Sequence, residues 1–242
     1  MSTSTPDVLV WVADGFAAEG LDYGDRLVDR LSGQGLCVAR RDLTSINGAV
    51  PPARLHILSG GATSVNDRST WMPRALALTR LLVQGAGRED YTIVGICLGS
   101  QMIAEALWPG GIRSCGQIEV GLTEVQWHDG ESECIVVPAF HYEGIDPSMV
   151  SRGGGQVVAG NAHSLVQSFR IGFNIWGLQF HPEFNSADMR RLVKYHRPII
   201  EAYGGTVEAA LRSVEQFEVR WKQELFDRIF HRISTGNRVP SK

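Results

Sequence analysis

The chain has 242 residues, of which 43% are hydrophobic and 20% are charged, so it can bury a sizeable core. A formal net charge of -3, without a basic stripe of interleaved aromatic residues, argues against a nucleic-acid partner. No apolar run approaches the roughly 18 residues that a membrane-spanning helix needs. The first run, Val8–Ala13, is too short for a secretion signal and follows no basic residue. We therefore expect a cytoplasmic protein without a membrane partner.

The first half of the chain alternates strands with helices. We expect strands over Val8–Ala13, Leu36–Arg40, Arg54–Leu58 and Tyr91–Ile96, and helices over Tyr23–Ser32, over Met72–Gln84 and directly after Cys97. This alternation predicts β-α-β units, and therefore an α/β fold whose mostly parallel sheet carries helices on both faces.

The character of the pattern changes after the helix that follows Cys97. Three strands are expected with no helix between them, over Gln117–Trp127, Glu133–Pro138 and Gln156–Ala159. The segment Arg170–Phe180 is typical of a hairpin that turns at residues 172–174. These features predict an antiparallel extension of the sheet.

Two helical segments are expected after Phe184. The second begins near Thr206, a suitable N-cap, and its apolar residues recur at about 3.6-residue spacing as a single helix. Its stripe comprises Ala210, Leu211, Val214, Phe217, Trp221, Leu225 and Ile229, and its end is indicated by Arg228, His231, Arg232 and Gly236. No boundary or linker interrupts the chain, so we predict one domain over residues 1–242. Its core covers about 7–184 and its C-terminal helical extension about 185–236.

Cys97 has unusual local chemistry, since it lies between two glycines where a buried strand runs into a helix. Gly95 and Gly99 allow a sharp bend, and a helix N-terminus stabilises a thiolate. This is the pattern of a nucleophile elbow, which predicts a strained backbone at Cys97 and an oxyanion donor in the Leu98 amide. The alternative is an ordinary buried cysteine at a tight turn.

The other three cysteines form no C-x-x-C pair, so neither a disulfide scaffold nor a zinc ribbon is expected. Cys37 and Cys134 lie in apolar runs and are interpreted as small core residues, whereas Cys115 has no informative neighbours.

His181 and Glu183 follow the predicted hairpin within "GLQFHPEF". On a regular strand they would share one face, although Pro182 changes the local geometry. A histidine base oriented by a carboxylate would complete a cysteine triad, while the alternative is a solvated turn. A zinc site drawing also on His141, Glu143 and His163 is disfavoured, because their spacing matches no known ligand pattern.

Ser59, Gly60 and Gly61 end another predicted strand and offer unobstructed backbone amides to an oxyanion or a carboxylate. An ordinary β-to-α turn would look the same. The chain has neither the glycine-rich dinucleotide motif nor the phosphate-binding P-loop motif, so no cofactor is expected.

Together, "LSGG", "GICLGSQ" and "GLQFHPE", in this order, resemble the class I, triad-type glutamine amidotransferases. The similarity spans about Leu55 to Phe184 and is closest to the amidotransferase domain of GMP synthetase and its stand-alone relatives. The resemblance implies a flavodoxin-like three-layer sandwich. It implies a catalytic triad of Cys97, His181 and Glu183, and an oxyanion hole from the amides of Gly61 and Leu98.

The resemblance also implies a substrate pocket. Gln101 would contact glutamine, and "FHYEG" corresponds to the segment whose backbone holds the α-amino and carboxylate end of the substrate. That segment places Phe140, His141, Tyr142 and Glu143 along the pocket.

Two positions depart from the family pattern. Ala62 stands where the family usually has proline, and Tyr142 replaces a small glycine, so the substrate site is expected to be smaller or reshaped. A synthetase domain, to which such a unit can be fused, is not recognised in the chain.

Three functions therefore remain open. The favoured one is hydrolysis of glutamine through a Cys97 thioester, with ammonia delivered to a separate synthetase subunit. The others are a free-standing γ-glutamyl hydrolase and a catalytically idle regulatory subunit.

The last helix carries aromatic residues that are interpreted either as part of a wide buried face or as a docking surface for a second copy or an acceptor enzyme. These residues are Phe217, Trp221, Phe226 and Phe230.

Overall fold

The structure is a computed structural model that describes residues 5–14, 22–45, 50–88, 90–129, 132–221 and 224–235. The strands are β1 (Val8–Val12), β2 (Val38–Asp42), β3 (Leu55–Leu58), β4 (Thr92–Ile96), β5 (Ile112–Trp127), β6 (Glu133–Ile145), β7 (Gln156–Gly160), β8 (Ser168–Ile171) and β9 (Ile175–Leu178). The helices are α1 (Tyr23–Ser32), α2 (Met72–Gly87), α3 (Leu98–Leu107), α4 (Pro147–Arg152), α5 (Ser186–Tyr195), α6 (Arg197–Ala202), α7 (Val207–Phe217) and α8 (Leu225–Thr235).

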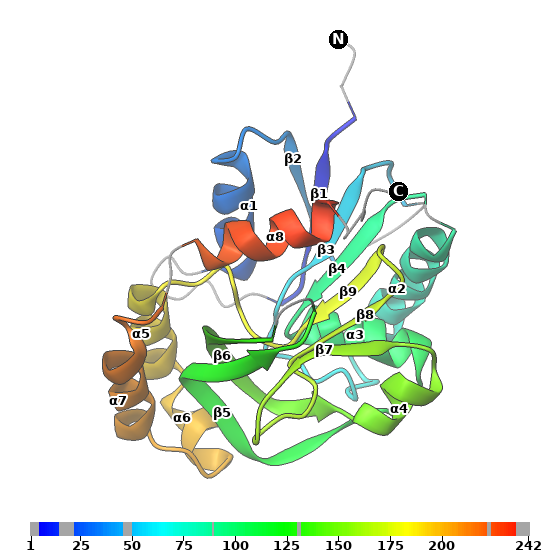
Figure 1. Cartoon of the computed structure of the whole chain (residues 1–242). Coiled ribbons are helices and arrows are strands. Elements are labelled where there is room, and N and C mark those ends of the chain that lie inside the picture. The colour runs from blue at the N-terminus through cyan, green and yellow to red at the C-terminus, as the bar shows by residue number, and fades with distance from the viewer. Residues whose placement is uncertain are drawn as a thin grey trace.

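Within these residues the strands form one sheet in the order β2-β1-β3-β4-β9-β8-β7-β5-β6 (Figure 1). The strands from β2 to β9 pair in parallel, and those from β9 to β6 pair antiparallel. The predicted α/β class, the parallel half and the antiparallel extension are therefore confirmed. Because β4 and β9 are neighbours, the end of β4, directly before Cys97, lies beside the end of the hairpin that β8 and β9 form.

Helices cover both faces of the sheet because the parallel strands are buried on both faces. In β1, Leu9 and Trp11 pack toward α2 and α3, whereas Val8, Val10 and Val12 pack toward α1 and α8. This is the period-two alternation of a strand between two layers. A third apolar cluster joins α5, α6 and α7 to β5 and β6, at the lower left of Figure 1.

The C-terminal segment differs from the prediction, since the expected single helix is divided into α7 and α8. Glu218 ends α7, and its carboxylate accepts hydrogen bonds from Arg190 and Ser186 of α5. The apolar residues of α7 pack over β5 and β6, whereas those of α8 pack against α1 and the parallel strands. The periodicity is continuous, but its two parts belong to different clusters.

The docking-surface interpretation of this segment is wrong for its last two aromatic residues. Phe226 and Phe230 are buried, 0% and 5% exposed, and their rings stack 4.3 Å apart. Phe217 and Trp221 are half-buried against the third cluster. The wide buried face is the alternative that the structure supports.

The core positions predicted for Cys37 and Cys134 are also wrong, because both residues are exposed. Cys37 immediately precedes β2 and Cys134 lies on β6, and these strands are the two edges of the sheet. An edge strand leaves part of its surface to solvent even when its sequence is apolar.

Several elements extend beyond their predicted boundaries. β6 continues to Ile145, so the expected pocket segment is a strand, and α4 has no counterpart in the sequence prediction. Gly236, expected beyond the last helix, lies outside the described residues. In the part of the chain that the structure describes, no helix combines the length and the apolar character needed to cross a bilayer.

Candidate active site

Cys97 joins β4 to α3 with φ 49° and ψ -109°, and it is the only non-glycine residue with positive φ in the described part of the chain. The predicted strain is confirmed. Gly99 is required here because a Cβ at this position would lie 2.2 Å from the Leu58 carbonyl oxygen. A Cβ at Gly95 would lie 2.4 Å from the Gly99 backbone, so the elbow is too tight for a side chain at either glycine.

His181 and Glu183 lie in the turn after β9 rather than on a regular strand. They nevertheless meet, with His181 Nδ1 2.7 Å from Glu183 Oε1, and both side chains are completely buried. Burial alone would lower the pKa of His181, but the charges of Glu183 and Cys97 raise it to about 10. These charges favour the protonated form of the ring beside the Cys97 sulfur. The solvated-turn alternative does not fit this burial.

A pocket opens beside Cys97. The substrate-binding residues expected from the resemblance all line it: Gly61, Leu98, Gln101, Phe140, His141, Tyr142 and Glu143. His181 and Glu183 are absent from this lining and lie behind Cys97 within the core. The pocket therefore presents the sulfur to a ligand while the ion pair stays away from water.

Gly60 and Gly61 bring the turn after β3 close to this centre. A Cβ at Gly60 would lie 2.6 Å from His181 Cε1, and one at Gly61 would lie 2.7 Å from Leu98 Cδ2. Leu98 is the first residue of α3, so its amide has no carbonyl partner within the helix. The backbones of Gly61 and Leu98 thus lie on the same side of the pocket as Cys97.

Residues that the sequence analysis did not single out complete the pocket wall. Tyr23, at the start of α1, packs 5.2 Å from the His181 ring, and burial raises its pKa, so the phenol stays neutral. His196 and Ile199 come from the C-terminal helices. No local motif marks these positions, because they meet the pocket through packing between distant segments.

Tyr142 forms the part of the wall where the family has glycine. Its ring stacks on Tyr203 with centroids 3.9 Å apart, and burial, followed by the neighbouring Tyr203 and Glu143, raises its pKa. Tyr142 is therefore held against Tyr203 in the wall of the pocket.

Glu143 is anchored at both its carboxylate and its backbone. The carboxylate accepts hydrogen bonds from Ser64 Oγ and from Asn66 Nδ2, at 2.8 Å and 3.2 Å. Its carbonyl accepts from Gln101 Nε2 at 3.1 Å and faces His141 Nδ1 at 3.2 Å. This segment of β6 is held in a fixed conformation.

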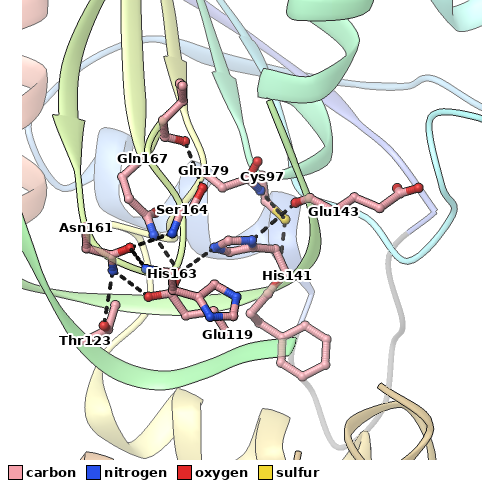
Figure 2. Close-up of polar contacts among 12 residues, drawn as sticks. Cys97, Glu119, Thr123, His141, Glu143, Asn161, His163, Ser164, Gln167 and Gln179 are labelled. Carbon is pink, nitrogen blue, oxygen red and sulfur yellow. Dashed lines mark hydrogen bonds and ion pairs between the residues drawn. The ribbon is translucent and has the colours of Figure 1, made fainter. Parts of the chain in front are cut away.

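A buried polar cluster lies behind the pocket, around Glu119 of β5 (Figure 2). Glu119 Oε2 is 2.9 Å from His141 Nε2, and Oε1 accepts from Asn161 at 2.6 Å. Burial would raise the pKa of Glu119, but His141 and Asn161 lower it to about 2. In the described part of the chain, His, Cys, Asp and Glu form no group of three or more that could hold a metal ion.

Comparison with known protein families matches the chain to glutamine amidotransferase class-I over residues 44–194, more than half of its length. The chain belongs to this family. Class-I amidotransferases are glutamine-hydrolysing enzymes, and the matched region contains Cys97, His181 and Glu183 together with the pocket residues. The comparison with curated proteins gave no match.

Solved structures agree with this amidotransferase fold. A glutamine amidotransferase from Thermotoga maritima superposes with a TM-score of 0.69 at 20% identity, covering 94% of this chain and 98% of its own. One from Methylobacillus flagellatus gives 0.71 at 19% identity, covering 96% and 95%. A putative GMP synthase subunit from Thermoplasma acidophilum gives 0.55 at 21% identity, covering 87% and 98%.

Proposed function

We propose that this class-I amidotransferase hydrolyses glutamine through a thioester on Cys97 and delivers the ammonia to a separate acceptor enzyme. The observation that carries the proposal is the buried His181–Glu183 pair beside the strained Cys97. An imidazolium next to the sulfur favours the thiolate, which is the nucleophilic form of cysteine.

In the proposed reaction the thiolate attacks the γ-carbonyl carbon of glutamine and a C–S bond forms. The carbonyl electron pair moves to oxygen, where the amides of Gly61 and Leu98 stabilise it, an effect worth about 10²–10³ in rate for a single donor. His181 donates its proton to the amide nitrogen as the C–N bond breaks, so ammonia leaves. Water then attacks the thioester with His181 as base, which releases glutamate and regenerates the Cys97 thiolate.

The separate acceptor enzyme is proposed from one of the similar solved structures. One similar structure is that of a putative GMP synthase subunit, so this domain type is found as a separate polypeptide of a synthase. Ammonia is mostly protonated and unreactive at neutral pH, so a donor benefits from docking onto its acceptor. The isolated chain is accordingly expected to hydrolyse glutamine slowly, and faster when the partner is bound.

Tyr142 stands in the pocket wall where the family has glycine, so its ring favours glutamine over bulkier γ-glutamyl conjugates. The decisive assay measures glutamate release by the purified chain from glutamine and from a γ-glutamyl dipeptide. We expect measurable hydrolysis of glutamine and little cleavage of the dipeptide. Rapid dipeptide cleavage would instead identify a free-standing γ-glutamyl hydrolase, and no turnover of either would favour an idle subunit.

The nucleophile has its own test. Cys97→Ala and His181→Ala should abolish turnover, while Glu183→Ala should reduce it less because an orienting group contributes less than the base. An electrophilic glutamine analogue should add once, at Cys97. Cys37 and Cys134 are the more exposed thiols, so labelling there would contradict a specially activated Cys97.

A further inference from the structure

Gln179 is a buried side chain to which the mechanism above gives no role. It is 1% exposed and lies directly after β9, two residues before His181. Its Nε2 is 3.8 Å from Cys97 Sγ, and its Oε1 accepts a hydrogen bond from Gln101 Nε2 at 3.3 Å. Because the Gln179 oxygen faces a donor, its NH₂ group is the end that faces the sulfur.

The Gln101 amide is itself oriented by the Glu143 carbonyl. A carbonyl oxygen can only accept, so Gln101 directs its NH₂ group at this oxygen and at Gln179 Oε1. His141 Nδ1 faces the same carbonyl at 3.2 Å and must therefore carry a hydrogen. The positions of Gln101 and His141 thus depend on one backbone oxygen.

The far end of this chain of contacts is a fixed negative charge. Glu119 and His141 are cross-strand partners of β5 and β6, directly after an irregularity in the register. The Glu119 carboxylate also accepts from Asn161 at 2.6 Å and from Gln167 at 2.5 Å. The His141 ring thus lies between two oxygen atoms, with the Glu143 carbonyl 3.2 Å from Nδ1 and the Glu119 carboxylate 2.9 Å from Nε2. Figure 2 shows Cys97, Gln179, Glu143, His141 and Glu119 in one cluster, with Asn161 and Thr123 on its other side.

The sulfur needs a donor of this kind. Cys97 Sγ lies 3.6 Å from the Phe140 carbonyl oxygen, a contact that suits a thiol but repels a thiolate. The Gln179 N–H has the opposite polarity and is the amide donor that the structure places beside the sulfur. Hydrogen bonds in resting sites are often long and shorten when charge develops on the reacting atom.

We propose that Gln179 is a further catalytic residue, whose amide donates to the Cys97 thiolate, and that Glu119 and His141 act as positioning residues by fixing that amide through Glu143 and Gln101. This inference rests on the proposed function, since it takes Cys97 as the nucleophile. The donor stabilises the thiolate before attack on glutamine and again when the thioester is cleaved.

The test follows the rate at which iodoacetamide alkylates Cys97 as a function of pH, with mass spectrometry separating this site from the other cysteines. Gln179→Met removes the donor at similar volume, and Gln179→Glu places an acceptor on the sulfur without changing shape. We expect the half-maximal pH of alkylation to rise by about one unit in Gln179→Met and further in Gln179→Glu. Glu119→Gln should shift it in the same direction by less.

Steady-state kinetics provide the second readout. In Gln179→Met, kcat for glutamine should fall about tenfold with little change in KM, because the lost interaction is with the nucleophile. Gln126→Met is the matched control. Gln126 lies on β5, and its side-chain amide donates to Ser132 at the surface. It should retain the wild-type alkylation profile and turnover.

The inference is wrong if folded Gln179→Met and Gln179→Glu both keep the wild-type alkylation profile. Should Gln179→Met fail to fold, the isosteric Gln179→Glu and the distant Glu119→Gln decide in its place. Alkylation does not require glutamine turnover. A wild-type protein that never hydrolyses glutamine would therefore contradict the proposed function, while the alkylation profiles would still decide the role of Gln179.

Discussion

Replacing Cys97 by glycine or by alanine separates backbone strain from chemistry. Both substitutions remove the thiol and its interaction with His181, so both should end turnover. They differ in the backbone, because φ 49° with ψ -109° is costly for any residue that has a Cβ. We expect Cys97→Gly to be more stable than Cys97→Ala.

The magnitude follows from two opposing effects. A non-glycine residue in a sparsely populated region costs about 1–3 kcal/mol, which glycine avoids. Glycine also costs about 0.5–1 kcal/mol because it gains more conformational freedom on unfolding than alanine does. For a strain of about 2 kcal/mol, the middle of that range, the net advantage of Cys97→Gly is about 1–1.5 kcal/mol, which corresponds to about 2–6 °C in Tm for a chain of this size.

Thermal and urea unfolding of the two variants, in the same buffer, measure this difference. Ala104→Gly within α3 is the control, because an ordinary helical position should lose about 1 kcal/mol or more on the same alanine-to-glycine exchange. The sign of the effect is thus opposite at the two sites. Equal stability of Cys97→Gly and Cys97→Ala, or a more stable Cys97→Ala, would refute strain at the elbow.

Three further predictions concern pH and pocket size. Burial lowers the pKa of His56 to about 4, and Trp11 donates a hydrogen bond to the neutral ring. About 3 kcal/mol of stability that is fully present above pH 6.5 should therefore be lost as pH falls through 4. His56→Gln should flatten this pH dependence in urea titrations. Because the pKa of Glu119 is lowered to about 2, wild type should be more stable than Glu119→Gln above pH 4.5, and this advantage should disappear as pH falls through 2. An advantage that persisted undiminished at pH 2 would contradict this prediction. Tyr142→Gly should raise kcat/KM for a γ-glutamyl dipeptide relative to glutamine, whereas Tyr203→Phe, which keeps the ring stack, should not.

The elbow was predictable from the sequence because its determinants are neighbours in the chain. Gly95, Cys97 and Gly99 lie on one strand-turn-helix unit, and a local pattern of apolar residues and glycines is enough to indicate it. His181 and Glu183 were predictable for the same reason, since only Pro182 separates them and the hairpin before them has a clear pattern. Their distance from Cys97 along the chain mattered less than the pairing of β4 with β9.

The features that were missed depend on contacts between distant segments. Gln179 meets Cys97 and Gln101 only because β9 lies beside β4, and no local pattern reveals that contact. The exposure of Cys134 depends on β6 being a sheet edge, which no local pattern reveals. The division between α7 and α8 likewise depends on which apolar cluster each part joins.

The position of β9 beside β4 also governs when the thiol becomes reactive during synthesis. Ile96 pairs with Leu178, and the Cys97 amide donates to the Leu178 carbonyl at 2.7 Å, yet β5 to β8 are translated between them. Contacts of such long sequence separation form late, and an emerging chain folds from its N-terminus. A ribosome-bound chain that stops before β9 therefore carries Cys97 without His181, so its sulfur lacks the neighbouring imidazolium. For the reaction proposed at Cys97, we therefore expect reactivity toward glutamine, and sensitivity to oxidants that attack thiolates, to begin only when β9 joins β4 in the sheet.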